Sequence, residues 1–396
     1  MKRILPLLLA GIMVLGLFGC STESQNIASS SEQQAAEPAK TEELSEGDTQ
    51  VASQDAIRTI SGKVSEIEKY GHASLDITIE DFKNAGFELG DIVTVEMDNF
   101  SQDMPYLNGY YVDKGEYMLR AYPGSETLAV CINYGNFSDE ANAQPGDDIL
   151  ITMKEEDGAS TLQEVNNLVY SNNRDNFESD EEFANFRPVV LGNITDWKLF
   201  RSASPIDNKY CRAAISNTLA ETVGVNAVMN LASTDEEILD AANQENFNSD
   251  YYKVLYDKGF VIPLGLPIAF EDDAFAQGIV RGLTFLSEHD TPYLVHCTEG
   301  KDRAGFACMV IEALMGATRE EIIDDYMISY KNYYGIEPGT EKYDAIVQNN
   351  IIPMLSIISN DESSSENSLA EDTEAYLLKY GMAPEAIENL KAKLSA

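Results

Sequence analysis

The residues of this sequence whose types and spacing best suit chemistry are Cys297 and Arg303, at the two ends of a seven-residue loop. The loop follows an apolar run at residues 293–296, which predicts a buried strand, and precedes an apolar stretch at 304–314, which predicts a helix. A loop wound between a strand end and a helix start turns successive backbone N–H groups inward, where they bind an anion. Thiols at helix N-termini near cations ionise readily, so this position favours a Cys297 thiolate.

The loop predicts nucleophilic attack on phosphorus. The planar guanidinium of Arg303 can return over the loop and bind two oxygens of a phosphoryl group. The thiolate beneath it would attack in line and form a cysteinyl-phosphate intermediate. Because the loop amides and Arg303 supply the charge stabilisation, the sequence predicts neither a metal ion nor a cofactor.

The composition narrows the class of protein. The chain has 396 residues, with 27 Lys and Arg against 67 Asp and Glu, which gives a net charge of −40. So acidic a chain repels a polyphosphate backbone, which argues against nucleic acid as a partner. With three His, five Cys and no paired spacing of these residues, the sequence offers no zinc site and no disulfide scaffold. A hydrophobic content of 44% is enough for folded cores.

The first twenty residues are typical of a targeting segment. Two basic residues precede an apolar run at residues 4–18, which is too short to span a bilayer comfortably but suits a secretory signal peptide. The run ends in Leu17-Phe18-Gly19-Cys20, which resembles the lipobox of bacterial lipoproteins. That resemblance implies a lipid anchor, diacylglycerol with palmitate, on Cys20 and an extracytoplasmic, membrane-anchored protein of a bacterial cell envelope. The alternative is a plain cleaved signal with an incidental cysteine.

Two folded regions follow a polar stretch. In the first, short runs with a period of two predict the strands of a small all-β module, at residues 60–67, 75–79, 92–97, 128–134 and 149–153. In the second, apolar runs predict strands at 189–194, 227–231, 261–264 and 293–296. Helical stretches alternate with them, at 274–288, 304–314 and 319–330, and two more lie between 368 and 394.

This alternation predicts an α/β domain with a mostly parallel sheet flanked by helices, preceded by the all-β module. The module itself shows no residues grouped for chemistry. We therefore divide the chain into a lipoprotein signal peptide (1–19), a disordered tether (20–56), the all-β module (57–154), an acidic connector (155–187) and a catalytic domain (188–396).

The loop and three other segments resemble a known family. His296-Cys297, five further residues and Arg303 resemble the signature of the protein tyrosine phosphatase superfamily, and the Gly-Lys-Asp-Arg-x-Gly run at 300–305 resembles its bacterial branch of tyrosine and lipid phosphatases. Segments 199–204, 229–231 and 325–329 are similar, in the same order, to further segments of that branch. The resemblance implies a tyrosine phosphatase-like fold for about 189–334 and says nothing of the β module.

The resemblance also implies a role for each loop residue. Cys297 is the expected nucleophile and Arg303 the phosphate clamp. Asp302 is the expected general acid, while Asp272 and Asp273 lie where other branches keep a mobile acid loop and remain the alternative. The other loop positions are expected to bind substrate: Thr298, Glu299, Gly300, Lys301 and Ala304.

Two of these positions carry more specific expectations. Ala304 stands where the family usually has a hydroxyl residue that helps the thiolate leave the phosphoenzyme, so we expect slow breakdown of the intermediate. Lys301 either contacts further phosphates on an inositol ring or faces solvent.

The leading hypothesis is a cysteine-dependent, dual-specificity type of phosphatase that hydrolyses phosphomonoesters. Phosphotyrosine protein is the favoured substrate, and phosphoinositide or soluble inositol phosphate are the alternatives. A non-enzyme alternative is a phosphate-binding or adhesive surface lipoprotein whose loop is vestigial. Hydrolysis of an aryl phosphate distinguishes the two.

Overall fold

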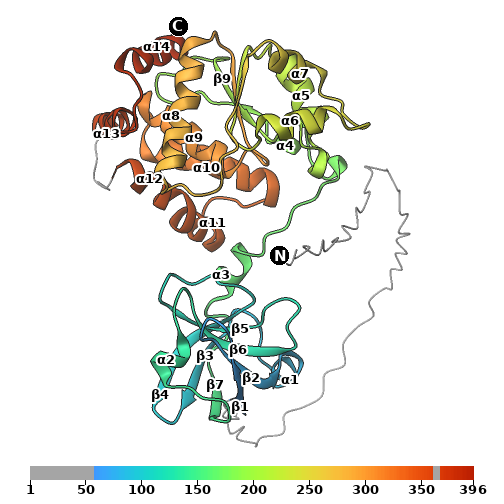
Figure 1. Ribbon diagram of the computed structural model, residues 1–396, viewed down its shortest axis with the longest axis vertical. Coiled ribbons are helices and arrows are strands. Elements are labelled where there is room, and N and C mark those ends of the chain that lie inside the picture. Colours follow the sequence, from blue (N-terminus) through green and yellow to red (C-terminus); the bar gives the residue numbers. More distant parts are fainter. Residues whose placement is uncertain (1–57, 360–365) are drawn as a thin grey trace, which may run out of the picture. The chain divides into compact units, whose positions relative to one another are not determined.

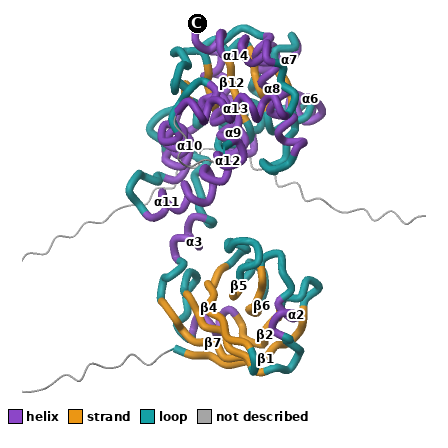
Figure 2. Tube along the Cα trace, turned by 90° about the vertical axis from the view of Figure 1, so that its left-hand side faces the viewer, coloured by secondary structure: helices purple, strands orange, loops and turns teal. Residues whose placement is uncertain are grey.

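The computed structural model describes residues 58–359 and 366–396, and Figures 1 and 2 show their path. The expected signal peptide, the tether and Cys20 lie outside the described residues. Within these two ranges, no helix combines the length and the apolar character needed to cross a membrane. The β-barrel and the α/β domain are described separately below.

The first folded part is a closed barrel whose strands follow the order β1-β2-β6-β5-β4-β3-β7, with β7 pairing back to β1. All neighbours are antiparallel except β4 and β5, which run parallel. Val93 and Val95 of β3 and Ile151 of β7 point into the barrel and are fully buried, as alternating strand residues do. The elements are β1 (Thr59–Ile67), β2 (Ala73–Thr78), α1 (Ile79–Asn84), β3 (Ile92–Met97), β4 (Phe100–Leu107), β5 (Tyr117–Arg120), β6 (Thr127–Ile132), α2 (Phe137–Ala141) and β7 (Asp148–Glu155).

The barrel corrects the expected all-β module in two respects. It contains the short helices α1 and α2, and residue 79, expected in a strand, begins α1 because the Thr78 hydroxyl accepts a hydrogen bond from the Asp81 amide at 2.9 Å. The sequence also fails to predict β4 and β5. In β4, three polar residues at 101–103 and a proline at 105 hide the alternation that marks a strand.

The α/β domain is built on a five-stranded sheet in the order β11-β10-β12-β9-β8. The first four strands run parallel, and the two-residue β8 lies antiparallel at the edge. The strands are β8 (Arg187–Pro188), β9 (Leu199–Ser202), β10 (Ala227–Asn230), β11 (Val261–Pro263) and β12 (Tyr293–His296).

The strand expected at 189–194 is wrong. After β8 the chain turns. Both the backbone and the side-chain amide of Asn193 donate to the carbonyl oxygen of Met315 at 2.9 Å. This segment therefore hydrogen-bonds to the residue that follows α9 in place of forming a strand. The sheet position is filled by β9, which the sequence does not predict because the charged Arg201 interrupts its apolar pattern.

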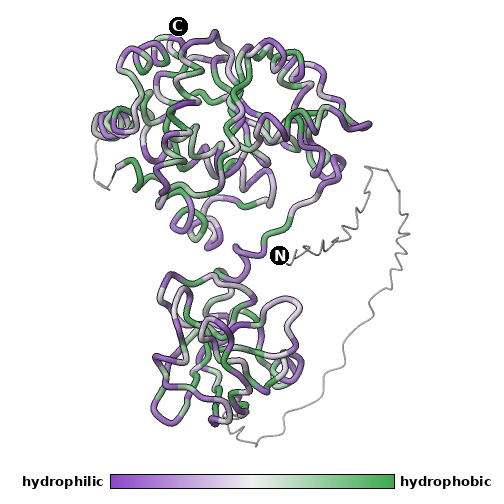
Figure 3. The backbone as a smooth tube through the Cα atoms, in the orientation of Figure 1, coloured by the Kyte–Doolittle hydropathy of each residue, from purple (hydrophilic) through white to green (hydrophobic). Residues whose placement is uncertain are grey.

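Helices cover both faces of this sheet, as Figure 1 shows. Tyr293 and Val295 of β12 belong to the core beneath α8, α9 and α10, whereas Leu294 belongs to the core on the opposite face, beneath α5 and α7. The strands and α9 are the hydrophobic segments at the centre of this part in Figure 3. The helices are α3 (Ser160–Val165), η1 (Arg174–Asn176), α4 (Asp180–Phe183), η2 (Asn208–Tyr210), α5 (Ala213–Thr222), α6 (Asp235–Ala242), α7 (Asp250–Asp257), α8 (Asp273–Glu288), α9 (Asp302–Leu314), α10 (Arg319–Tyr334), α11 (Glu341–Ile346), the π-helix η3 (Val347–Ile351), α12 (Ile352–Ile358), α13 (Glu366–Lys379) and α14 (Pro384–Ser395).

Helix α9 fixes the position of the loop at residues 297–303 relative to the sheet. Every residue from Ala304 to Leu314 is buried, so the helix is held on all sides by the core. Its N-terminus follows the carboxyl end of β12 after a short loop. The loop is therefore suspended between two buried, rigid elements, which is where precise positioning of side chains is possible.

Candidate active site

The loop begins at Cys297, directly after β12, and ends in the first turn of α9. The Cys297 side chain is only 3% exposed. Gly300 has a φ of +71°, and a Cβ atom built on it would lie 2.2 Å from the carbonyl oxygen of Ser202, so the position admits only glycine. The backbone N–H of Ser204 donates to the carbonyl oxygen of Thr298 at 3.0 Å. These contacts seat the loop closely against the end of β9.

Arg303 folds back over the loop that it ends. Its Nη1 donates to the carbonyl oxygen of Leu266 at 2.8 Å, and its Nη2 donates to the Thr298 hydroxyl at 3.0 Å. Its Nε is buried and has no hydrogen-bond partner among the described residues. A buried donor without a partner is costly, so this N–H suits a phosphoryl oxygen bound beside Cys297.

A buried ionic network holds the loop from behind. Arg201 of β9, 1% exposed, donates through Nη2 to the carbonyl oxygens of Gly300 (2.9 Å) and Lys301 (3.1 Å). Its Nη1 donates to Asp325 of α10 at 2.6 Å, and Arg187 of β8 donates to the same carboxylate at 3.0 Å. Burial acts to raise the pKa of Asp325, but the two guanidinium groups outweigh it and lower the pKa to about 2.

This network also fixes the direction of two backbone N–H groups of the loop. In a trans peptide the C=O and the following N–H point in opposite directions. Because Arg201 binds the carbonyls of Gly300 and Lys301, the N–H groups that follow them are directed away from Arg201, toward the mouth of the loop. The arrangement is an anion nest at a helix N-terminus.

His296, next to Cys297, serves the backbone. Its Nδ1 lies 3.2 Å from the carbonyl oxygen of Cys297 and its Nε2 3.3 Å from the hydroxyl of Tyr252. Burial lowers the pKa of His296 to about 4, so the ring is neutral at neutral pH. Since a carbonyl only accepts, Nδ1 carries the hydrogen, and Tyr252, which accepts from Asn230 at 2.9 Å, donates to Nε2.

Asp302 is the candidate acid that lies in the loop. It is the first residue of α9, and its carboxylate is 3.7 Å from the ammonium of Lys301. Burial raises the pKa of Asp302, and the opposing effect of Lys301 does not cancel it. A carboxyl group that keeps its proton to higher pH is suited to protonate a leaving group.

The alternative acids occupy a different segment. Asp272 precedes α8 and lines a depression of about 370 Å³ together with Phe270 and Asn350. The carboxylate of Asp273 accepts from the Tyr380 hydroxyl at 3.0 Å. Their segment meets the loop through Leu266, whose carbonyl binds Arg303. The choice between Asp302 and these residues stays a prediction.

The expected substrate-binding positions lie together in the loop, with different surroundings. Ala304 is fully buried in the first turn of α9, and Thr298 binds Arg303. Glu299 and Lys301 face each other, with 3.5 Å between a carboxylate oxygen and the ammonium. The Lys301 side chain is 12% exposed, so the alternative that it faces solvent is wrong.

Three residues that contact the loop are missed by the sequence reasoning. The hydroxyl of Tyr170 donates to the Glu299 carboxylate at 2.6 Å, and Tyr333 and Asn185 donate to the Glu299 carbonyl oxygen at 2.6 and 3.2 Å. Tyr333 follows the motif aspartate Asp325 by two helical turns, so the helical period could have indicated it. Nothing in the sequence distinguishes Tyr170 among twenty tyrosines.

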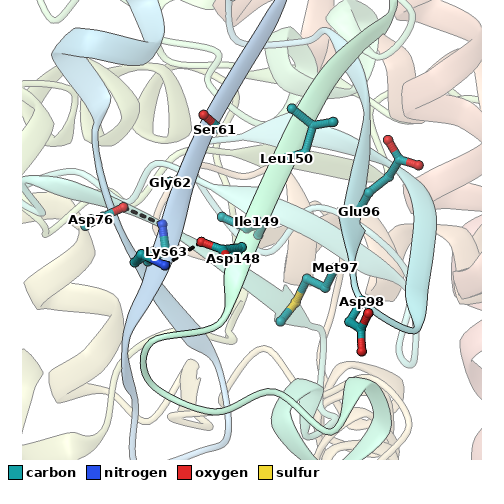
Figure 4. Close-up of a pocket in the computed structure, with 10 residues that line it drawn as sticks. All are labelled: Ser61, Gly62, Lys63, Asp76, Glu96, Met97, Asp98, Asp148, Ile149 and Leu150. Carbon is teal, nitrogen blue, oxygen red and sulfur yellow. Dashed lines mark hydrogen bonds and ion pairs between the residues drawn. The ribbon is translucent and has the colours of Figure 1, made fainter.

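A second depression, of about 610 Å³, lies on the barrel and is shown in Figure 4. Its lining includes four carboxylates, from Asp76, Glu96, Asp98 and Asp148, and one cation, Lys63. Lys63 pairs with Asp148, and its backbone N–H donates to Asp76 at 2.6 Å. These carboxylates would repel an anionic substrate, so this depression is unsuited to a phosphate ester.

Comparison with known proteins gives a family match. Residues 184–396 match the sequence model of the tyrosine phosphatase family. No curated protein matches the chain.

Three solved structures share similarity. An uncharacterized conserved protein from Thermotoga maritima is 22% identical, with 24% of this chain and 36% of that chain covered and a TM-score of 0.22, so the matched region spans about a third of that protein's length. The core catalytic domain of the PP-IP phosphatase SIW14 from S. cerevisiae, in complex with citrate, is 15% identical, with 44% and 96% covered and a TM-score of 0.24. P. aeruginosa TpbA is 18% identical, with 52% and 92% covered and a TM-score of 0.19. Because these TM-scores are below 0.5, the family assignment depends on the match to the family model.

Proposed function

The chain belongs to the tyrosine phosphatase family and is a phosphoric monoester hydrolase, and from this premise we propose that it acts through a phosphocysteine formed on Cys297. The observation that carries the proposal is the buried, unpartnered Nε of Arg303 above a loop that begins at Cys297. A phosphoryl group seated there accepts from the guanidinium and from the loop amides directed toward it.

The proposed reaction has two displacements. In the first, the Cys297 sulfur forms a bond to phosphorus as the ester P–O bond breaks, and Asp302 gives its proton to the leaving oxygen. In the second, a water oxygen attacks phosphorus, Asp302 takes up a proton from that water, and the thiolate leaves as inorganic phosphate is released. Because Ala304 offers no hydroxyl to the departing sulfur, we expect the second step to be the slower one.

The proposed substrate is phosphotyrosine in a protein. Support comes from the aromatic side chains beside the loop, where the rings of Tyr210, Tyr333 and Tyr334 lie 4.7–6.0 Å from that of Tyr170, centre to centre. Such rings present faces and edges on which an aryl group can pack. Phosphoinositides and soluble inositol phosphates are the competing substrates in the test.

The test uses the full chain with an aryl phosphate and then a panel of phosphotyrosine peptides, phosphoinositides and inositol phosphates. Hydrolysis is expected to persist in a chelator, to be inhibited by vanadate, and to leave a phosphoenzyme that rapid quenching and mass spectrometry locate on Cys297. Cys297→Ser is expected to abolish turnover. Turnover retained in that variant would refute the mechanism, and a preference for a lipid or inositol substrate would replace the proposed substrate.

We also propose that the protein is anchored to a membrane outside the cytoplasm through a lipid on Cys20. The support is the sequence alone, an apolar run that ends in a lipobox-like segment before Cys20. Expressed in bacteria, the full chain is expected to incorporate a clickable palmitate analogue and to sediment with membranes. Cys20→Ser should abolish labelling, and labelling that survives this change would reject the anchor.

A further inference from the structure

The ammonium of Lys301 lies among charged and aromatic groups of its own chain. Its ammonium lies 3.5 Å from the Glu299 carboxylate, 3.7 Å from the Asp302 carboxylate and 3.4 Å from the hydroxyl of Tyr334. It also lies 5.0 Å from the ring centre of Tyr330 and 5.4 Å from that of Tyr334, within the range of cation–π attraction. The ammonium therefore has one hydrogen-bond acceptor, two ion-pair partners and two aromatic rings of its own chain around it.

Glu299 is the partner that is itself held in place. One carboxylate oxygen accepts from the Tyr170 hydroxyl at 2.6 Å, and the other faces Lys301. Tyr170 is positioned by Arg212, which lies 4.9 Å from its ring centre and donates to the next carbonyl oxygen, that of Ser171, at 2.8 Å. The carboxylate is thus set beside Lys301 by a contact that originates in the connector.

The charge balance of the loop changes during the proposed reaction. To act as an acid, Asp302 must carry a proton, and burial raises its pKa in that direction. A protonated Asp302 no longer neutralises Lys301, so Glu299 is then the carboxylate that does. Burial alone would lower the pKa of Lys301, but the facing carboxylates and phenols outweigh it and hold the pKa well above its ordinary value, so the ammonium stays charged.

We propose that Glu299 is a specificity-determining residue, and that its pairing with Lys301 restricts the loop to substrates that carry a single phosphate. The inference rests on the proposed function and refines it. Arg303 and the loop amides bind the reacting phosphate. Lys301 is the other cation of the loop, and a second phosphate that approaches it would meet the negative charge of Glu299 beside it. Monophosphorylated groups are therefore accepted and polyphosphorylated rings are disfavoured.

The test measures binding in the full chain carrying Cys297→Ser, so that the result does not depend on turnover. The probes are inositol 1-phosphate and inositol 1,4,5-trisphosphate, which share a ring and differ in the number of phosphates. Calorimetry gives the ratio of their dissociation constants. Adding Glu299→Gln is expected to shift this ratio toward the trisphosphate by about tenfold, the effect of one charge-assisted hydrogen bond. Tyr170→Phe should shift it in the same direction by less.

Two controls separate the pair from other causes. Glu288→Gln removes an equal charge at the exposed end of α8. The chain passes from there to the amino end of β12, whereas the loop follows the carboxyl end of that strand. It should leave the ratio unchanged. Lys301→Met added to Glu299→Gln should cancel the gain for the trisphosphate. Thermal unfolding curves show that each variant is folded.

The outcomes are distinct from those of the proposed function. A ratio unchanged in both Glu299→Gln and Tyr170→Phe overturns the inference, as does an equal shift in Glu288→Gln or a shift that survives Lys301→Met. Aryl phosphate turnover by the unsubstituted full chain is measured alongside. Its absence would reject the phosphatase mechanism while the binding ratio still decides the role of Glu299.

Discussion

Two structural requirements explain why residue 300 is a glycine, and the replacement of Gly300 by alanine violates both. The first is backbone conformation, because φ is +71°. A residue with a Cβ atom pays about 1–2 kcal/mol in this left-handed region. The second is space, because the new Cβ would lie 2.2 Å from the carbonyl oxygen and 2.3 Å from the carbonyl carbon of Ser202.

The second requirement determines the effect on activity. Ordinary contacts of a Cβ begin near 3.4 Å, so the loop and β9 must separate by roughly 1 Å. Ser202 is buried in β9, which β12 and β8 flank, so the strand cannot yield and the loop must move. A displacement of about 1 Å in a catalytic group can cost on the order of 10²-fold in rate. We therefore expect Gly300→Ala to lower kcat/KM for an aryl phosphate by about 10²-fold.

Gly224→Ala is the matched control. Gly224 has a φ of +70°, and no atom lies within 4 Å of its hypothetical Cβ, so this variant incurs the conformational cost without the clash. Urea unfolding followed by fluorescence of Trp197, the only tryptophan of the chain, reports the stability of the α/β domain. Gly224→Ala should lose about 1–2 kcal/mol and keep its kcat/KM. If Gly300→Ala also keeps its kcat/KM, the close seating of the loop against β9 is not needed for catalysis.

Three further predictions concern the charged and small residues around the loop. Asp302 must be protonated when Cys297 attacks, and burial raises its pKa, so kcat/KM, which reports this first displacement, should fall as pH rises through that pKa. Asp302→Asn should lower kcat/KM about 10²–10⁴-fold and flatten the fall, whereas the same behaviour in Asp272→Asn would assign the acid to that residue. Ala304→Ser should speed phosphoenzyme breakdown, seen as a higher kcat and a smaller burst; an unchanged burst contradicts the slow second step. Folding lowers the pKa of Asp325 from 3.8 to about 2, so as pH falls the unfolded chain takes up this proton before the folded one does. About 2 kcal/mol of the free energy of unfolding present above pH 4 should therefore be lost between pH 4 and pH 2, as measured by urea titrations. Asp325→Asn, itself destabilised by about 3–5 kcal/mol, should not show this loss.

The sequence predicts best where the pattern of one segment decides the structure. The runs at 92–97 and 293–296 are strands with those bounds, and the helix expected at 274–288 is α8. The tyrosine phosphatase family assignment is confirmed by the match of residues 184–396. In each case a local apolar period or a fixed spacing of functional residues carries the information.

Prediction fails where partners distant in the sequence determine the structure. Strand β9 carries Arg201, which an apolar pattern excludes, and it is stable there because Asp325, more than a hundred residues later, neutralises it. The segment at 189–194 is apolar enough for a strand, yet Asn193 binds the carbonyl oxygen of Met315. The contact between Tyr170 and Glu299 likewise joins residues 129 positions apart, and no spacing rule reaches that far.

The spacing of Cys297 and Arg303 is therefore one of two requirements for the site. The other is that the loop amides point at the phosphate, and that depends on Arg201, which binds the opposite side of the same peptides. Arg201 is fully buried, so its charge is tolerated only because Asp325 is ionised beside it, and Asp325 in turn stays ionised because Arg187 adds a second guanidinium. Arg187, Arg201 and Asp325 thus affect both the stability of the domain and the orientation of the loop amides. For this reason the motif residues alone do not specify an active site.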